Sequence, residues 1–161
     1  MFLISPANPI HLRKIYSMIL ALAKQEGILN RIELSQKQFE DILFCDIPKH
    51  FAAIAVIEEK VVGVVLYNFT HHNICFNISN GIYIETMYVE PEFRNKGIGS
   101  ALFSYVAREA EEKSCSRIEC WVSVNNVPVN RFYHNLGCVA LNQWVIYKCD
   151  KQSIAKLMRK N

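Results

Sequence analysis

Two glycines and two cations stand close together in the stretch from Val89 to Leu102, which reads VEPEFRNKGIGSAL. Gly97 and Gly99 remove side chains where a backbone turns and approaches another group closely. The helix that follows offers N–H groups without intrahelical partners and the positive end of its dipole. Such a turn binds phosphate, and Arg94 and Lys96 add positive charge to it. The stretch predicts a phosphate-binding turn, with an ordinary glycine turn before a helix as the alternative.

The same stretch lacks the features of two better-known phosphate motifs. The third glycine of a dinucleotide-binding fingerprint is absent, and no Gly-Lys-Ser/Thr run follows as in a nucleotidase phosphate loop. The formal charge of +3 is also too small to indicate nucleic acid, because nucleic-acid domains usually carry a concentrated basic face. An anionic small ligand fits these charges better than an anionic polymer.

The residues around the turn predict a strand before it and a helix after it. Gly81 to Val89 is rich in β-branched and aromatic residues, and Ile98 to Ala110 has its apolar residues on one helical face. A second strand, Arg117 to Val124, completes a right-handed crossover. Asn126 then caps a helix through Leu136, and Gly137 is typical of a helix end.

The rest of the chain predicts further helices and strands of an α/β domain over residues 1–161. With 51% hydrophobic and 20% charged residues, the composition excludes intrinsic disorder. Residues 70–81 are expected to form a loop. The other expected elements are a strand over Phe2–Ser5, a helix from Asn8-Pro9 to about Gln25, a helix from the Ser35 capping box to before Pro48, a hairpin of Phe51–Ile57 and Val61–Phe69, a strand over Trp144–Cys149 and a helix over Ser153–Arg159.

The six cysteines indicate a reducing compartment. No pair has the short spacing of a zinc or redox motif, so we expect free, buried thiols in the cytoplasm, with three disulfides as the alternative. The apolar run from Ile15 to Ala23 has a helical rhythm and follows late positive residues, which favours an amphipathic helix over a signal peptide. No apolar run approaches the roughly 20 residues of a membrane span.

Two ordered motifs resemble those of the GNAT superfamily of N-acetyltransferases. Arg94 to Gly99 matches its Arg/Gln-x-x-Gly-x-Gly/Ala motif, and Asn126 to Gly137 looks like its second signature, Asn-x-x-x-x-x-Phe-Tyr-x-x-x-Gly. The resemblance covers essentially the whole chain and is closest to the spermidine/spermine (diamine) and thialysine N-acetyltransferase branch. The stretches that resemble this branch are Leu20–Glu26, Tyr67–Thr70, Tyr83–Glu85 and Gly97–Ser100.

The resemblance implies a mixed central β-sheet flanked by helices, with two splayed central parallel strands. Acetyl-CoA, the cosubstrate, would lie in the gap between these strands. Backbone groups of the first strand would pair with the pantetheine arm, and amides of the turn would hold the pyrophosphate. The cofactor-binding residues that the resemblance implies are Met87, Tyr88, Val89, Arg94, Asn95, Lys96, Gly97, Ile98, Gly99, Ser100, Asn126 and Val129.

Acetyl transfer to an amine needs a base and an acid. An amine with a pKa of about 10 is protonated at pH 7 and attacks a thioester only after losing a proton. Glu85 is the acid within its strand, and the resemblance implies that it is the base, acting through water; a solvent-facing glutamate is the alternative. Tyr133 matches the tyrosine that protonates the departing thiolate, with core packing as the alternative. A backbone N–H near Met87 would stabilise the thioester oxygen.

The substrate-binding residues implied by the resemblance are Glu26, Glu85 and Thr86. Thr86 stands where polyamine enzymes have a second carboxylate, and Gln25 replaces an aromatic residue. The region around Trp144 also lacks the acids found in the animal enzymes. Fewer carboxylates weaken the attraction for a multiply charged polyamine, so a shorter amine, a lysine-like amino acid or an unrelated substrate is the alternative.

The sequence therefore predicts a cytoplasmic acetyl-CoA-dependent N-acetyltransferase whose substrate is a small primary amine that attacks directly in a ternary complex. His71 and His72 have no matching partners, so we expect no metal. We expect no nucleic-acid or membrane partner, and the resemblance implies a homodimer. The alternatives are an acetyltransferase for protein N-termini or lysines on the same fold, and a non-catalytic acyl-CoA-binding module.

Overall fold

A computed structural model describes residues 1–71 and 79–159 of the chain. The chain divides into two compact units, Met1–Trp121 and Val122–Asn161, which we call the first unit and the second unit. The expectation of one domain over residues 1–161 stays a prediction, and most of the loop expected over residues 70–81 lies outside the described residues.

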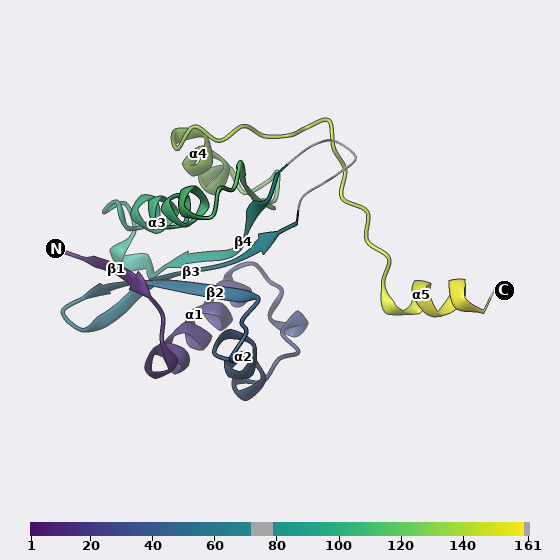
Figure 1. Cartoon of the computed structure of the whole chain (residues 1–161), viewed down its shortest axis with the longest axis horizontal. Coiled ribbons are helices and arrows are strands. Elements are labelled where there is room, and N and C mark those ends of the chain that lie inside the picture. Colours follow the sequence, from purple (N-terminus) through teal and green to yellow (C-terminus); the bar gives the residue numbers. More distant parts are fainter. Residues whose placement is uncertain (72–78, 160–161) are drawn as a thin grey trace. The chain divides into compact units, whose positions relative to one another are not determined.

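The first unit contains a five-stranded mixed sheet with the strand order β1-β2-β3-β4-β5 (Figure 1). The first three pairings are antiparallel, whereas β4 and β5 pair in parallel and are joined by the crossover helix α3. The predicted strand–helix–strand unit is therefore confirmed. The strands are β1 (Leu3–Pro6), β2 (His50–Ile57), β3 (Lys60–Thr70), β4 (Gly81–Val89) and β5 (Arg117–Cys120).

Helices cover both faces of this sheet (Figure 1). On one face lie α1 (Leu12–Gln25) and α2 (Gln36–Leu43), and on the other lies α3 (Ile98–Glu112). Each face buries its own apolar cluster, so the sheet is held between two layers of helix. Short 3-10 helices precede α1 at Pro9–His11, follow it at Leu29–Arg31 and precede α3 at Pro91–Phe93. The α1 and α2 cluster includes Ile15, Met18, Leu43, Ile54 and Val64, and the α3 cluster includes Val65, Ile82, Ile84, Leu102 and Val106.

Local sequence signals fix several of these elements. The side chain of Ser35 accepts a hydrogen bond from the Gln38 N–H, and the Gln38 side chain accepts one from the Ser35 N–H at 2.9 Å, so the capping box starts α2. The hairpin between β2 and β3 turns at Glu58 and Glu59, whose φ angles are +46° and +64°. Two adjacent residues at positive φ are the requirement of a type I′ turn, which matches the twist of the strands.

The predicted strand Arg117–Val124 is too long, because β5 ends at Cys120. Its ladder with β4 runs only from Gly81 opposite Arg117 to Ile84 opposite Cys120. A strand continues only where a neighbour supplies hydrogen-bonding partners, so β5 ends where this pairing ends.

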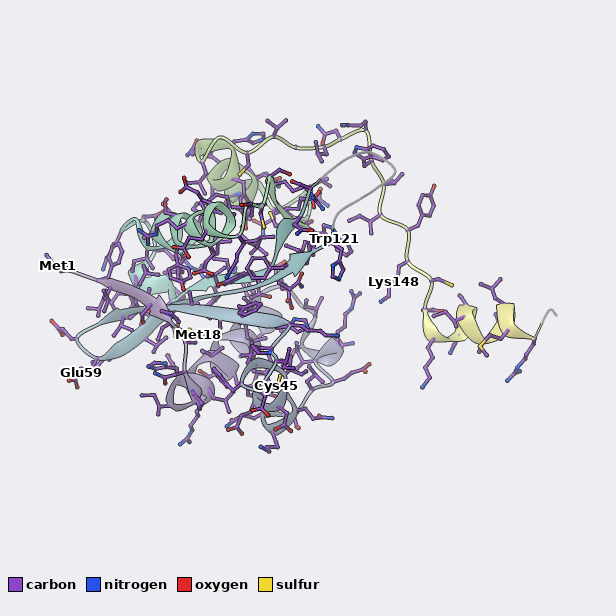
Figure 2. The ribbon with its side chains drawn as sticks, viewed as in Figure 1. Met1, Met18, Cys45, Glu59, Trp121 and Lys148 are labelled. Carbon is purple, nitrogen blue, oxygen red and sulfur yellow. The ribbon has the colours of Figure 1, made fainter. Side chains whose placement is uncertain are left out.

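The second unit contains two helices, α4 (Val127–Asn135) and α5 (Lys151–Met158), and none of its residues up to 159 is buried. The strand predicted over Trp144–Cys149 is wrong, since this segment is irregular; its residue Lys148 is labelled in Figure 2. The side chains of Trp144 and Tyr147 are 70% and 92% exposed. An apolar, β-prone segment forms a strand only beside another strand, and none of the described residues pairs with this one.

The cysteines that the structure describes form no disulfide with one another, as expected, but they are not buried. Cys45 and Cys149 are exposed, while Cys115, Cys120 and Cys138 are half-buried. Cys75 lies outside the described residues. Among residues 1–71 and 79–159, no helix is both long and apolar enough to cross a membrane.

Candidate active site

A β-bulge places Glu85 at the centre of the sheet. Leu66 of β3 lies opposite Thr86, whereas the next residue, Tyr67, lies opposite Ile84, so Glu85 is the extra residue of β4. A bulge re-aims side chains because it interrupts the alternation of the strand. The sequence signal for this feature is weak, since the bulge depends on the register between two strands.

The bulge changes which face the residues of β4 occupy. Before it, Ile82 and Ile84 pack in the α3 cluster, and after it Met87 and Val89 pack there. Strict alternation would put residues 82, 84, 86 and 88 on one face. Tyr88 instead belongs to the α1 and α2 cluster. Consecutive residues Glu85 and Thr86 therefore lie together on the face that α1 and α2 cover.

Pairing between the central parallel strands also stops at this point. Ile84 is the last residue of β4 that pairs with β5, and Met87 to Val89 have no partner in the described residues of β5. The N–H and C=O groups of these residues that face this edge remain for another extended chain, apart from the Val89 carbonyl oxygen, which accepts a hydrogen bond from Arg94. An arm with two amide groups, such as pantetheine, fits this requirement by adding a strand.

The turn after β4 has the geometry of an anion site. Asn95 and Gly97 have φ angles of +59° and +81°, and Gly97 is the N-cap of α3. Within the described part of the chain no side chain caps this helix, so the amides of Ile98 to Ser100 point out of its first turn without an intrahelical partner. These amides and the helix dipole suit the pyrophosphate of acetyl-CoA.

Arg94 ties this turn to the end of α1. Its Nε donates a hydrogen bond to the Val89 carbonyl oxygen at 2.9 Å, and its Nη2 donates one to Gln25 Oε1 at 3.0 Å. The guanidinium also lies 5.4 Å from the ring centroid of Tyr88. Lys96 stands beside it, with its Nζ 5.2 Å from the ring centroid of Phe93.

The carboxylate of Glu85 has two polar neighbours that the sequence did not reveal. Its Oε1 accepts a hydrogen bond from Asn68 Nδ2 at 2.8 Å and lies 2.7 Å from His50 Nδ1. The Glu85 and His50 side chains are 29% and 40% exposed. His50 and Asn68 lie opposite each other in the β2–β3 ladder, so three strands contribute to this group, which we call the Glu85 cluster. The sequence has no local signal for this cluster, because His50 lies one residue before the predicted strand Phe51–Ile57 and the contact depends on the register of three strands.

Neutral tyrosines line the same strand. Burial raises the pKa of Tyr83, with Cys120 and Glu85 adding to the shift, and its ring contacts Trp121 at 5.5 Å between centroids. Burial also raises the pKa of Tyr88, the residue beneath Arg94. Both phenols therefore stay protonated at neutral pH, so neither adds negative charge beside Glu85.

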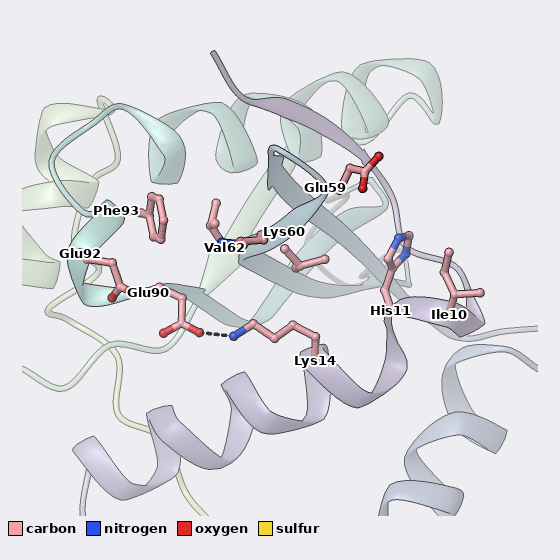
Figure 3. A pocket seen from close by; sticks show the side chains of 10 residues that line it. Ile10, His11, Lys14, Glu59, Lys60, Val62, Glu90, Glu92 and Phe93 are labelled. Carbon is pink, nitrogen blue, oxygen red and sulfur yellow. Dashed lines mark hydrogen bonds and ion pairs between the residues drawn. The ribbon is translucent and has the colours of Figure 1, made fainter.

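A cavity of about 510 Å³ lies at the opposite end of the sheet from the Glu85 cluster, between the start of α1, the β2–β3 turn and the 3-10 helix before α3 (Figure 3). An ion pair between Lys14 Nζ and Glu90 Oε1, 2.6 Å apart, crosses one wall. None of the Glu85 cluster lines this cavity, so the cavity and the predicted site are separate places.

Two other predicted substrate residues lie in the first unit. Glu26 is the exposed C-cap of α1, one residue after Gln25, and Thr86 is half-buried beside the bulge. His71 is exposed, whereas His72 lies outside the described residues. Across the described ranges, no three His, Cys, Asp or Glu side chains group as metal ligands would.

The second unit contains Asn126, Val129 and Tyr133. Asn126 caps α4 as predicted, with its Oδ1 accepting from the Val129 N–H at 3.3 Å. The ring of Tyr133 packs on Phe132 with 5.1 Å between centroids. Gly137, at a φ of +85°, ends α4 as predicted, and the Cys138 N–H donates to the Tyr133 carbonyl oxygen at 3.0 Å. These contacts of Tyr133 and its helix are all made by residues of the second unit.

The bulge, the unpaired β4 edge and the glycine turn all lie within the stretch that matches a known family. The model of the acetyltransferase (GNAT) family matches residues 30–138. The chain belongs to this family. It is an acetyl-CoA-dependent N-acetyltransferase, and the predicted mixed sheet flanked by helices is confirmed as the GNAT fold.

Relatives and solved structures agree with this assignment. The acetyltransferase is 27% identical over 157 residues to the thialysine N-epsilon-acetyltransferase of Bos taurus, covering 91% of each chain. Its fold matches an integron cassette protein of V. cholerae with a TM-score of 0.79, 20% identity and 98% of each chain covered. An aminoglycoside N-acetyltransferase in complex with CoA matches with a TM-score of 0.68 and 22% identity, over 90% of this chain and 97% of that one. The two structures show the shared fold alone.

Proposed function

We propose that this acetyltransferase acetylates the primary amine of a small molecule, namely a polyamine, a diamine or a lysine-like amino acid, by direct attack in a ternary complex. One observation carries the proposal. The Glu85 carboxylate stands at the bulge from which the unpaired β4 edge begins, so a base lies next to the predicted path of the acetyl donor. The name of the Bos taurus relative supports a lysine-like acceptor.

The first unit provides the features that hold acetyl-CoA in this proposal. Acetyl-CoA supplies the thioester carbonyl that the amine attacks. The backbone of Met87 to Val89 pairs with its pantetheine arm, and the amides from Asn95 to Ser100 hold its pyrophosphate. Arg94 braces the turn through Val89 and Gln25, with its charge at the edge of the phosphates.

Glu85 and Tyr133 divide the proton transfers. An ammonium substrate has three protons on nitrogen, and the product amide keeps one. Glu85 takes one proton, through water, and releases it to solvent; the nitrogen then attacks the thioester carbon. Tyr133 gives its proton to the thiolate as the carbon–sulfur bond breaks, and the remaining amine proton restores the phenol. A backbone N–H near Met87 stabilises the thioester oxygen during the attack.

The charges around the acceptor favour a substrate with one ammonium near the site over a polyamine. Glu85 supplies one carboxylate, and Thr86 supplies a neutral hydroxyl where a second carboxylate would strengthen the attraction for a second cation. Glu26 at the end of α1 is the proposed partner for a more distant positive group. A lysine-like amino acid or a short diamine meets this pattern best.

Two measurements test the proposal. Isothermal titration with acetyl-CoA checks the cofactor site, and a panel of spermidine, a diamine, thialysine and lysine checks the acceptor. We expect turnover of thialysine, lysine or the diamine, and a loss of kcat on the order of 10²–10⁴-fold in Tyr133→Phe and Glu85→Gln. The control Glu58→Gln changes an exposed residue outside the proposed site. Turnover of peptides with no turnover of any small amine would show a protein acetyltransferase instead.

The proposal includes a homodimer in the cytoplasm. The apolar residues Trp144 to Tyr147 are exposed in the second unit, and a contact between two copies would cover them. Light scattering behind a sizing column should give twice the mass of the chain. A monomer at micromolar concentration, with Trp144→Asp behaving as the wild type, would contradict this part.

A further inference from the structure

The Glu85 cluster contains a histidine to which the proposed mechanism gives no role. His50 is the first residue of β2 and lies opposite Asn68 of β3. Ala53 and Ala55 pack in the α3 cluster and Ile54 in the α1 and α2 cluster, so alternation puts His50 on the α1 and α2 face. This is the face to which the bulge turns Glu85.

Both polar neighbours meet the same oxygen of Glu85. An ionised carboxylate only accepts hydrogen bonds, so the 2.7 Å contact with Glu85 Oε1 is a hydrogen bond when His50 has its proton on Nδ1. Asn68 Nδ2 donates to the same Oε1 at 2.8 Å. Neither bond uses Oε2. Within residues 1–71 and 79–159 no other hydrogen bond reaches this oxygen, so a water molecule or the substrate amine can bind it.

Two donors on one oxygen fix the orientation of the whole carboxylate. The terminal torsion of a glutamate side chain is broad when nothing holds it. Here donors from β2 and β3 hold a side chain from β4, and neighbouring pairings in the ladders set the spacing of all three strands. A base held in one orientation before the substrate binds loses less entropy when it reacts.

We propose that His50 and Asn68 are positioning residues that hold Glu85 Oε1, so that Oε2 is the oxygen that receives the proton of the acceptor amine. This inference rests on the proposed role of Glu85. His50 acts through Glu85, and the property that this role requires is a hydrogen-bond donor at the position of Nδ1. An amide at the same position satisfies the same requirement.

Steady-state kinetics of His50→Ala, His50→Asn and Asn68→Ala test the inference, with the best amine of the panel as acceptor. We expect kcat to fall on the order of tenfold in His50→Ala and Asn68→Ala, while the KM for acetyl-CoA stays within about twofold. His50→Asn keeps an amide N–H near the place of Nδ1 and should recover most of the loss. His11→Ala is the matched control, because His11 Nδ1 bonds the Asn8 N–H at 3.1 Å, outside the cluster.

The outcomes separate this inference from the proposed function. Full activity of Glu85→Gln would overturn the role of Glu85 and, with it, the positioning role. A large loss in Glu85→Gln beside unchanged kcat in His50→Ala would overturn the positioning role alone. Equal losses in His50→Ala and His50→Asn, with wild-type melting curves, would also overturn it. If His50→Ala does not fold, the other two variants test the inference. It requires kcat near wild type in His50→Asn and a lower kcat in Asn68→Ala.

Discussion

The first unit buries apolar side chains on both faces of its sheet, whereas the second unit buries none of its described residues. A lack of apolar residues does not explain this difference, because the second unit has many apolar residues that are exposed. Burial follows from the ordered neighbours of a strand or a helix, and hydrophobic content alone does not produce it. The exposed apolar residues of the second unit include Val139, Leu141, Trp144, Val145, Ile146, Tyr147, Ile154, Leu157 and Met158.

The proposed site residues are distributed over both units. The proposed donor-binding turn leads into α3, and the Glu85 cluster stands on β2, β3 and β4, all of which contribute buried residues to the core. Tyr133 stands on α4, a helix without a buried residue. We therefore expect changes in the first unit to affect both stability and activity, and changes in the second unit to affect activity or local structure.

The largest expected effect is on the free energy of unfolding. Leu102 of α3 is fully buried, and Leu102→Ala should lower this free energy by about 2–5 kcal/mol, because it leaves a cavity. Leu157→Ala removes the same atoms from an exposed site on α5 and should change it by less than about 0.5 kcal/mol. Urea unfolding followed by circular dichroism measures both. Equal losses would show that Leu157 is buried in the assembled protein and would end the contrast between the units.

The next effect separates backbone conformation from cofactor binding. Gly97 and Gly137 have φ angles of +81° and +85°, and an added Cβ would meet no atom within 4 Å at either position. Alanine at either position therefore costs only the conformational strain, about 1–2 kcal/mol. Only Gly97→Ala distorts the proposed pyrophosphate turn, so it should weaken acetyl-CoA binding on the order of tenfold in calorimetry. Similar weakening in Gly137→Ala would show that the turn has no special role.

These differences explain which features the sequence could predict. The capping box at Ser35, the turn at Glu58 and Glu59, the glycine turn at Gly97 and the end of α4 at Gly137 depend on residues a few positions apart. Their physical causes are local, and the predictions were confirmed. The site residues were named from the resemblance to the GNAT family, and their roles stay predictions.

Other features depend on the neighbours of a strand. The bulge at Glu85 arises from the register of β3 against β4, and the contact with His50 needs β2 in place as well. The end of β5 at Cys120 and the irregular path of Trp144 to Cys149 likewise depend on which strands are available for pairing. Propensity within one segment does not contain this information.

A smaller effect is expected in the first unit at alkaline pH. Burial raises the pKa of Tyr67, and the carboxylate of Glu109 raises it further. In the unfolded chain this phenol ionises at about pH 10, whereas in the folded unit it stays neutral. Its stabilising effect is therefore complete below about pH 10 and is lost as the pH rises further. Urea unfolding from pH 8 to 11 should show this decline, and Tyr67→Phe should flatten it. An unchanged slope in Tyr67→Phe would assign the decline to other groups.

The smallest effect is expected in the second unit, at acid pH. The carboxylate of Asp150 accepts a hydrogen bond from the Ser153 N–H at 2.8 Å at the start of α5, and this bond lowers the pKa of Asp150. A lowered pKa in the folded helix means that the cap stabilises α5 above the usual carboxyl pKa of about 4 and is lost as the pH falls below it. Amide exchange at Ile154 should therefore speed up below pH 4, relative to exchange in α3, in the wild type. Asp150→Asn keeps an oxygen acceptor that does not titrate and should remove this pH dependence.

If exchange in α5 and in α3 changed together with pH, the two units would unfold as one, and the contrast between them would be limited to surface exposure.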